Sequence, residues 1–262
     1  MPVAEYLSTE AYFHYLVANF GVRGYDFDDR AAVVARPDVD ITLRYCALLA
    51  PRPGDRFLEV GCGLGRVLKE LNAAYGIRPY GIDLTPKIIE AAKARVASIT
   101  TDLRVSPAEA IDHPSSFFDE VLCWGVFDLT QQEQSLKEMA RVTKRGGRIL
   151  LTGKSDRYFD DDSEARIAEE KSREKGIPNH YTDHAAMIGL ASDLGLQPTT
   201  QLFFARRGDF MKDQAFRQRP DRFYEWLVLF EKAADIDPAS APDTKIGDEY
   251  STTYRRLAAD RR

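Results

Sequence analysis

The chain has 262 residues and a formal net charge of −5 at pH 7. This length suits one α/β domain with additions, and a hydrophobic content of 44% is typical of a globular protein. The negative charge argues against nucleic acid as a partner, since proteins that bind phosphate backbones usually carry an excess of lysine and arginine. No apolar run approaches the roughly 18 residues of a membrane-spanning helix, so we expect no membrane partner.

The three cysteines, Cys46, Cys62 and Cys123, are odd in number and widely spaced. They lack the C-x-x-C spacing of a zinc site, and they fit no disulfide framework. The N-terminus lacks the basic flank and apolar core of a secretory signal. We therefore predict a cytoplasmic protein. The acidic run at 160–162 is interpreted as a solvated charge run, and no metal site is predicted.

Apolar residues at helical spacing predict two helices in residues 1–50, ahead of the first strand. The two patterns comprise Phe13, Leu16, Val17 and Phe20, and then Ile41, Tyr45, Leu48 and Leu49. Glycines at positions 21 and 24 separate them. We predict that this segment is an N-terminal helical cap.

A strand followed by a glycine-rich loop organises the rest of the chain. Residues 57–60 form a short apolar run, and residues 59–65 read Glu-x-Gly-x-Gly-x-Gly before a helical pattern begins. Glycines at a strand-to-helix turn adopt positive φ angles and let a ligand approach the backbone. The helix N-terminus then offers unpaired N–H groups. This arrangement predicts a nucleotide-type cofactor on the first βα turn of a doubly wound sheet.

The spacing of the glycines separates two kinds of nucleotide. The dinucleotide fingerprint G-x-G-x-x-G needs its third glycine where Arg66 stands, whereas Gly65 comes one residue early. Glu59 stands two residues before the first glycine. In these respects the loop resembles motif I of the class I S-adenosylmethionine-dependent methyltransferases, whose cofactor carries no phosphate. The resemblance implies S-adenosylmethionine as the cofactor and S-adenosylhomocysteine as its product.

A second strand ends in an acidic residue. Residues 79–83 read Pro-Tyr-Gly-Ile-Asp, which places Asp83 at the tip of the strand, and Thr85-Pro86 opens a helix. A carboxylate here can accept hydrogen bonds from both ribose hydroxyls, and its charge excludes a 2′-phosphate. Asp83 suits either kind of nucleotide, and a helix N-terminal acid is the alternative interpretation.

Further segments resemble methyltransferases of the ubiquinone- and menaquinone-biosynthesis type. Residues 105–111 and 117–122 are similar to that family's Gly-Asp-Ala-Glu and Ser-Phe-Asp segments, and 141–151 are similar to its Arg-Val-Leu-Lys-Pro-Gly-Gly turn into strand five. The resemblance implies that the Ala108 N–H contacts the adenine edge, with Glu109 beside it. Pro107 stands where the family usually has an acid that holds the adenine amino group.

The remaining patterns complete the sheet. We predict further strands at 103–105, 120–124, 148–152, 201–205 and 223–231, and a helix opened by a capping box at 130–133. By resemblance, the fold is an α/β, doubly wound, seven-stranded sheet of order 3-2-1-4-5-7-6, with strand 7 antiparallel and helices on both faces. The predicted domains are the cap (1–50), the methyltransferase core (51–232) and a C-terminal tail with helical spacing (233–262). Residues 154–182 are predicted to be a variable, solvated insertion over the active site.

The candidate cofactor-binding residues lie in the glycine loop, after strand two, in the adenine segment and after strand four. They are Glu59, Gly61, Cys62, Gly63, Gly65, Asp83, Leu84, Ala108, Glu109 and Trp124. Cys62 is interpreted as a small buried residue rather than a nucleophile.

The acceptor should approach over the carboxyl ends of strands four and five. The candidate acceptor contacts are Tyr15, Trp124, Phe127, Asp128, Lys154 and Tyr158. Trp124 and Phe127 suit an apolar or planar acceptor, although packing under the N-terminal helices explains them equally well. Methyl transfer from a sulfonium needs alignment and exclusion of water more than proton transfer. His180 is the candidate base for an acceptor that starts protonated.

The leading hypothesis is a methyltransferase that acts on a small-molecule acceptor, at O, N or C, by in-line displacement. Residues 124–127, Trp-Gly-Val-Phe, replace the Asn/Asp-Pro-Pro-Tyr tetrad of enzymes that methylate nucleic-acid bases. The alternatives are a nicotinamide-dependent Rossmann oxidoreductase, and a protein that binds S-adenosylmethionine without transferring methyl groups.

In related methyltransferases N-terminal helices often cover the cofactor, so the cap is either such a lid or plain core packing. The oligomeric state is left open.

Overall fold

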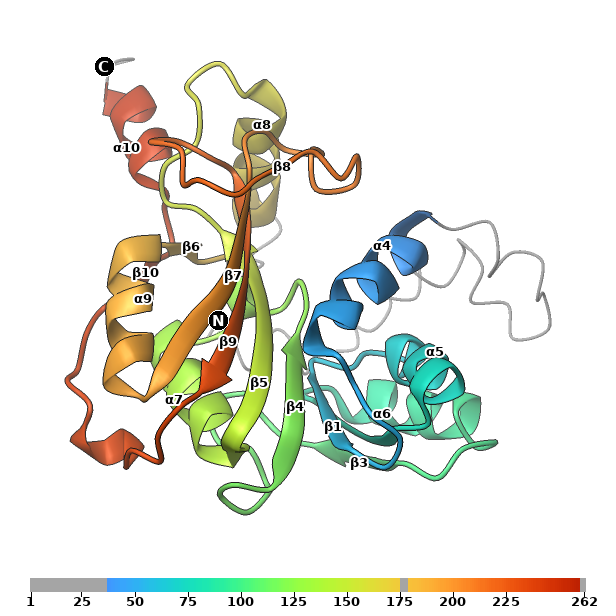
Figure 1. The fold of residues 1–262 in the computed structure, drawn as a ribbon. Coiled ribbons are helices and arrows are strands. Elements are labelled where there is room, and N and C mark those ends of the chain that lie inside the picture. The colour runs from blue at the N-terminus through green and yellow to red at the C-terminus, as the bar shows by residue number, and fades with distance from the viewer. Residues whose placement is uncertain (1–36, 175–178, 260–262) are drawn as a thin grey trace.

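The structure is a computed structural model that describes residues 37–174 and 179–259. Within these residues, a mixed sheet of eight strands forms the centre, and helices cover both of its faces (Figure 1). The strands of this sheet are β1 (Arg56–Val60), β2 (Arg78–Asp83), β3 (Asp102–Val105), β4 (Phe118–Cys123), β5 (Thr143–Lys154), β7 (Leu196–Phe204), β8 (Ala215–Phe216) and β9 (Glu225–Lys232).

The helices fall into three groups. One face of the sheet is covered by α4 (Pro37–Cys46), α5 (Arg66–Tyr75) and α6 (Pro86–Arg95). The other face is covered by α7 (Gln132–Val142) and α9 (His184–Asp193). Beyond one end of the sheet lie α8 (Ser163–Glu174) and α10 (Thr252–Ala259) (Figure 1). None of the described helices is both long enough and apolar enough to cross a lipid bilayer.

The strand order positions the site. Strands β1 to β5 run parallel, so their carboxyl ends lie along one edge of the sheet. Strand β9 runs antiparallel between β5 and β7. The predicted order 3-2-1-4-5-7-6 is confirmed, with β7 and β9 in the places of predicted strands six and seven.

The predicted count of seven strands needs a correction. In the described chain β8 is an eighth strand, and it pairs with the end of β7 at the edge of the sheet. Strand β8 has only two residues, both exposed, so it is too short to show an alternating pattern in the sequence.

Side chains alternate between two cores because successive residues of a strand point to opposite faces. In β5, Ile149 and Leu151 lie in the core beneath α7 and α9, whereas Leu150 lies in the core beneath α4, α5 and α6. The predicted helical stripes enter these cores, as with the fully buried Leu68 of α5 and Leu136 of α7. Burying each such side chain contributes roughly 1.5–3 kcal/mol.

The predicted capping box at 130–133 is wrong. Helix α7 begins at Gln132, and the side chain of its N-cap residue, Gln131, makes no capping hydrogen bond. The Thr130 hydroxyl instead donates to the Phe127 carbonyl (2.9 Å), and the Glu133 carboxylate accepts the Ile246 N–H (2.7 Å). Both side chains are therefore used to hold neighbouring segments in place.

The charged helix α8 is not a purely solvated excursion. Glu169 has no exposed surface, and its carboxylate accepts hydrogen bonds from the hydroxyls of Tyr158 (2.8 Å) and Ser251 (2.8 Å). Ser251 lies just before α10, and β10 (Gly247–Asp248) pairs with β6 (Tyr181–Thr182). The described part of the C-terminal tail is thus docked on the insertion. The division into cap, core and tail stays a prediction.

His184, the first residue of α9, lies in an aromatic cluster. Its ring centroid is 5.1 Å from that of Phe203, 5.9 Å from that of Phe223 and 5.6 Å from that of Trp226. Neither of its buried ring nitrogens has a hydrogen-bond partner among the described residues. Burial lowers the pKa of His184 to about 4.

This lowered pKa predicts acid sensitivity. An unfolded histidine has a pKa of about 6.5, so the unfolded chain takes up a proton between about pH 6.5 and pH 4 that the native state does not. The free energy of unfolding should therefore fall by about 1–3 kcal/mol as the pH drops through that window. Urea denaturation at pH 7 and pH 4.5 should show a smaller fall for His184→Leu. His180→Gln is the matched control, and an equal fall in wild type and His184→Leu would refute the assignment.

Candidate active site

A cleft of about 270 Å³ opens at the carboxyl edge of the parallel strands. Its lining comes from the ends of β1 and β2, the loop after β3, and the segment between β4 and α7 that includes the 3₁₀ turn η3 (Phe127–Leu129). The predicted cofactor residues that line it are Gly61, Asp83, Leu84, Ala108 and Glu109. The predicted residues outside the lining are Glu59, Cys62, Gly63, Gly65 and Trp124.

The glycines of the loop are required for different reasons. Gly61, Gly63 and Gly65 have φ angles of 72°, 50° and 70°, which L side chains rarely adopt. A Cβ atom on Gly61 would lie 2.4 Å from a Val126 methyl, so this glycine permits a close approach of the two segments. A Cβ atom on Gly63 would meet nothing within 4 Å. Gly63 therefore leaves open space above the loop.

Asp83 connects the tip of β2 to the glycine loop. Its carboxylate accepts the Gly63 N–H (3.2 Å) and the Thr85 N–H (2.9 Å), and the residue lines the cleft. Burial raises the pKa of Asp83, while these backbone hydrogen bonds oppose the shift. The carboxylate is thus fixed by two short loops at the position where the sequence predicted a ribose contact.

Glu59, in β1, and Cys62, in the glycine loop, are buried. Burial raises the pKa of Glu59 to about 8, opposed by the charge of Arg66 and by a hydrogen bond from the Leu68 N–H at the start of α5. Burial likewise raises the pKa of Cys62, so its sulfur is a thiol at neutral pH. Both residues are buried, and neither lines the cleft.

The loop after β3 reaches across to α7. The Glu109 carboxylate accepts the Gln131 N–H (2.7 Å), which joins the two sides of the cleft. The Ala108 N–H makes no hydrogen bond to the described part of the chain. An amide without an internal acceptor in the cleft lining is suited to a ligand. Pro107 also lines the cleft.

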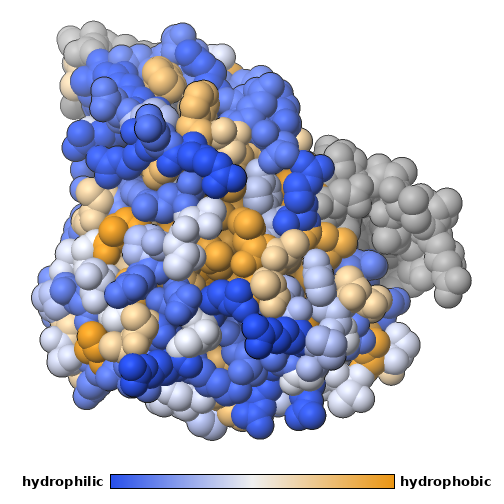
Figure 2. Space-filling model, viewed as in Figure 1, coloured by the Kyte–Doolittle hydropathy of each residue, from blue (hydrophilic) through white to orange (hydrophobic). Residues whose placement is uncertain are grey.

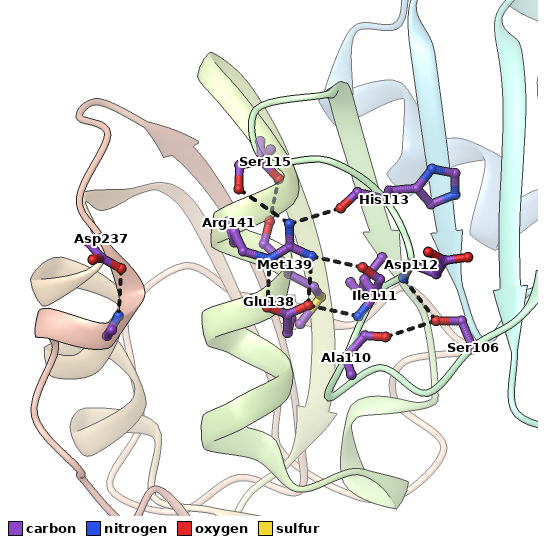
Figure 3. Close-up of polar contacts among 12 residues, drawn as sticks. Ser106, Ala110, Ile111, Asp112, His113, Ser115, Glu138, Met139, Arg141 and Asp237 are labelled. Atoms are coloured by element: carbon purple, nitrogen blue, oxygen red, sulfur yellow. Dashed lines mark hydrogen bonds and ion pairs between the residues drawn. The ribbon is translucent and has the colours of Figure 1, made fainter.

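Arg141 of α7 holds this loop in place (Figure 3). Its guanidinium donates to the carbonyls of Ile111 (2.8 Å) and His113 (2.9 Å) and to both carboxylate oxygens of Glu138 (2.7 and 2.8 Å). Glu138 also accepts the Ile111 N–H (2.8 Å). Hydrogen bonds to charged groups are stronger than neutral ones, so the loop that carries Ala108 is anchored without a ligand.

Sequence reasoning missed one wall of the cleft. Val126, Leu129, Thr130 and Gln131 line it, yet the patterns noted at 124–127 and 130–133 do not indicate a cofactor contact. Their position directly after strand four is the signal that could have found them, because the carboxyl end of that strand lies at the same edge.

Several predicted acceptor residues come together beside the cleft. Lys154 forms an ion pair with Asp128, and its Nζ donates to Asn179 (2.8 Å). The His180 N–H donates to the Asp128 carbonyl (2.6 Å). Burial is the largest single influence and would lower the pKa of Lys154, but the charge and hydrogen bond of Asp128 together with the charges of Tyr224 and Glu225 raise it. Asp128, Lys154 and His180 thus form one polar cluster.

The other predicted acceptor residues are placed differently. Phe127 packs on Trp226 and Tyr158 bonds to Glu169, and neither Phe127 nor Tyr158 has exposed surface. Trp124 is partly exposed. Tyr15 lies outside the described residues. Apolar surface crosses the middle of the molecule near the tips of β4 and β5, flanked by polar surface (Figure 2).

The acidic run has charged or backbone partners. Asp160 pairs with Arg222 and Asp161 with Arg206 (2.8 Å), while Asp162 accepts the Ala165 N–H (3.0 Å). Across the part of the chain that the structure describes, no group of three or more His, Cys, Asp or Glu side chains is placed to hold a metal ion.

Comparison with known proteins identifies the domain. A family model described as a methyltransferase domain matches residues 58–151. The chain is 30% identical over 132 residues to 27-O-demethylrifamycin SV methyltransferase of Amycolatopsis mediterranei, an alignment that covers 48% of each protein. Residues 58–151 thus match a methyltransferase domain, and the fold is that of the class I methyltransferases.

Two further similarities fit this domain. A ubiquinone/menaquinone biosynthesis C-methyltransferase of Geotalea daltonii is 32% identical over 106 residues, 38% of this chain and 45% of the relative. Geranyl diphosphate C-methyltransferase of Streptomyces coelicolor has the same fold, with a TM-score of 0.64 at 13% identity, over 88% of this chain and 98% of that one. The chain spans about half the length of the curated relatives that it matches.

The anchored loop of the methyltransferase domain generates a prediction. Arg141→Lys loses the two-pronged contact with Glu138 and the carbonyl bonds, so the loop carrying Ala108 should loosen. The dissociation constant for S-adenosylhomocysteine should rise about tenfold, roughly 1.4 kcal/mol. Titration calorimetry measures this affinity, and hydrogen exchange at residues 106–113 measures the loosening.

Arg145→Lys is the matched control, because Arg145 is an exposed arginine nearby whose guanidinium donates to the Ala233 carbonyl. It should change neither readout. Unaltered affinity in a folded Arg141→Lys protein would show that the loop is held in place by other contacts.

Proposed function

We propose that this chain binds S-adenosylmethionine in the cleft and transfers its methyl group to a small-molecule acceptor by in-line displacement. The observation that carries the proposal is the Asp83 carboxylate, held by the Gly63 and Thr85 N–H groups in the cleft of a methyltransferase domain. A carboxylate at this place is suited to ribose hydroxyls and disfavours a 2′-phosphate. The spacing at Arg66 and the domain match disfavour the nicotinamide alternative.

The residues of the cleft and of the glycine loop carry the chemical groups that would bind this cofactor. Asp83 would hold the ribose, and the open space above Gly63 would admit the amino-acid end of the cofactor. The unpaired Ala108 N–H would meet the adenine edge, with Glu109 beside it. The remaining proposed contacts support or flank these groups: Glu59, Gly61, Cys62, Gly65, Leu84 and Trp124.

Methyl transfer requires the protein mainly to align the acceptor with the methyl group. The sulfonium of the bound cofactor supplies an activated methyl group and a neutral leaving group. The chain has to bind the acceptor, hold its nucleophile in line and exclude water. We propose Trp124, Asp128, Lys154 and Tyr15 as acceptor contacts, the buried Phe127 and Tyr158 as residues that support them, and His180 as a base. A cytoplasmic location is also part of the proposal.

A small-molecule acceptor is supported by the relatives. One is named for methylating a demethylrifamycin oxygen and another for C-methylation in quinone biosynthesis. Their different acceptor atoms leave the choice among O, N and C to experiment.

The decisive experiment is calorimetric titration with S-adenosylmethionine, S-adenosylhomocysteine and NAD, after co-purified ligand is removed. We expect micromolar binding of the first two and none of NAD. Binding of NAD alone would overturn the proposal. Binding without turnover on any acceptor class would favour the interpretation as a protein that binds the cofactor without transferase activity.

A substitution in the glycine loop provides a second test. Gly63→Val puts a branched side chain into the open space above the loop, so S-adenosylhomocysteine binding should weaken at least 100-fold, about 2.7 kcal/mol. Gly146→Val is the matched control, because Gly146 also has a positive φ (76°) and open space around it but lies near the amino end of β5 and does not line the cleft. Similar affinities for the two folded variants would contradict the placement of the cofactor.

A further inference from the structure

A row of three side chains crosses the carboxyl edge of the sheet. Glu225, the first residue of β9, is directly paired with Lys154 of β5 and with Phe204 of β7. Directly paired residues of antiparallel strands have side chains on the same face. Phe204 lies in the core on the α4 side, so Glu225 and Lys154 also point to that side.

An aromatic cluster lies on the same side. It contains Tyr45 of α4, Trp124 after β4, Phe204 of β7 and Phe210 after β7. Trp124 and Phe210 have ring centroids 5.1 Å apart, and Phe210 is 4.6 Å from Phe204. Trp124 and Phe210 are only partly buried. The partly exposed rings therefore offer an apolar surface beside Glu225.

The Glu225 carboxylate has no bonding partner among the described residues. It is only partly buried, and among the described residues it accepts no hydrogen bond and forms no ion pair within 4.0 Å. Burial raises its pKa to about 7, opposed by the charges of Lys154 and Arg207 and reinforced by those of Asp128 and Asp209. Lys154 forms its ion pair with Asp128, and the Arg207 guanidinium donates to the Tyr224 hydroxyl (2.8 Å).

These surroundings select among ligand groups by charge. A cationic amine would meet Lys154 and Arg207 as well as Glu225, and an anionic group would meet Glu225 as well as the two cations, so either charge is partly repelled. A neutral hydroxyl meets neither penalty, and it can donate to the carboxylate.

We propose that the acceptor is an uncharged aromatic molecule bearing a hydroxyl, that its ring packs on Trp124 and Phe210, and that Glu225 accepts the proton of the hydroxyl that is methylated. This inference rests on the proposed function, specifies its acceptor, and assigns the role of base to Glu225 in place of His180. In the reaction an oxygen lone pair forms the O–CH₃ bond, and the C–S bond breaks with its electron pair left on sulfur. The hydroxyl proton passes to the Glu225 carboxylate and then to water.

The acceptor class is tested with three compounds on one ring: 2-naphthol, 2-naphthylmethylamine, which is cationic at neutral pH, and 2-naphthoate. Calorimetry with the wild-type protein saturated with S-adenosylhomocysteine measures binding, and chromatography of reactions with S-adenosylmethionine measures 2-methoxynaphthalene. We expect 2-naphthol to bind at least tenfold more tightly than the others and to be methylated. Equal or tighter binding of the amine or the carboxylate, or no binding of any, would overturn the inference.

The role of Glu225 is tested by Glu225→Gln. We expect unchanged affinity for S-adenosylhomocysteine, a fall of about 100-fold in kcat/KM for 2-naphthol, and loss of the rise in rate through about pH 7. Glu225→Asp should restore part of the rate. Glu231→Gln, an exposed glutamate at the other end of β9, is the matched control and should behave as wild type.

The outcomes separate the two proposals. An unchanged pH profile in Glu225→Gln, or loss of that profile in His180→Gln instead, would refute the role of Glu225. Binding of 2-naphthol without methylation would do the same. Failure of the wild-type protein to bind S-adenosylhomocysteine would instead refute the proposed function, because that measurement involves no acceptor.

Discussion

The hydrogen bond between the Gly63 N–H and the Asp83 carboxylate is the contact on which the rest of the site depends. It joins the first two βα turns, and it keeps a carboxylate at the wall of a cleft where burial raises its pKa. Gly63 has a φ of 50°, which L side chains rarely adopt, and its N–H donates to the carboxylate while its missing side chain leaves open space above the loop. One short polar contact thus fixes both the acidic group and the room for a ligand.

A second set of polar contacts fixes the opposite wall before any ligand binds. Arg141 and Glu138 of α7 pair with each other and with backbone groups of the loop after β3, and Glu109 of that loop reaches the start of α7. A loop that is already ordered loses less conformational entropy when a ligand binds. The ion pair on α7 therefore acts on the cleft through the backbone, although neither of its side chains lines it.

The sequence predicts what local spacing determines and fails where distant contacts decide. The glycine loop and the acidic strand tip follow from short motifs with a known spacing, and the strand order follows from the resemblance to the methyltransferase family. The two residues of β8 are too few to show a pattern, and Thr130 and Glu133 match a capping box but bond to Phe127 and Ile246 instead. Glu169 stands in a charged stretch typical of a solvated helix, yet it is buried with Tyr158, 11 residues away, and Ser251, 82 residues away, bonded to its carboxylate. Such partners cannot be read from spacing.

Glu225 shows why the antiparallel strand matters for chemistry. In parallel strands the last residues of each strand lie at the carboxyl edge of the sheet. Site residues are therefore sought in the sequence at the ends of strands, as with Asp83 and Lys154. Strand β9 runs in the opposite direction, so its first residue reaches the same edge, in register with Lys154. A carboxylate at the start of a strand carries no motif, and only the topology assigns it to the site. The reversed strand that distinguishes this sheet thereby adds a titratable group to the edge where the parallel strands end.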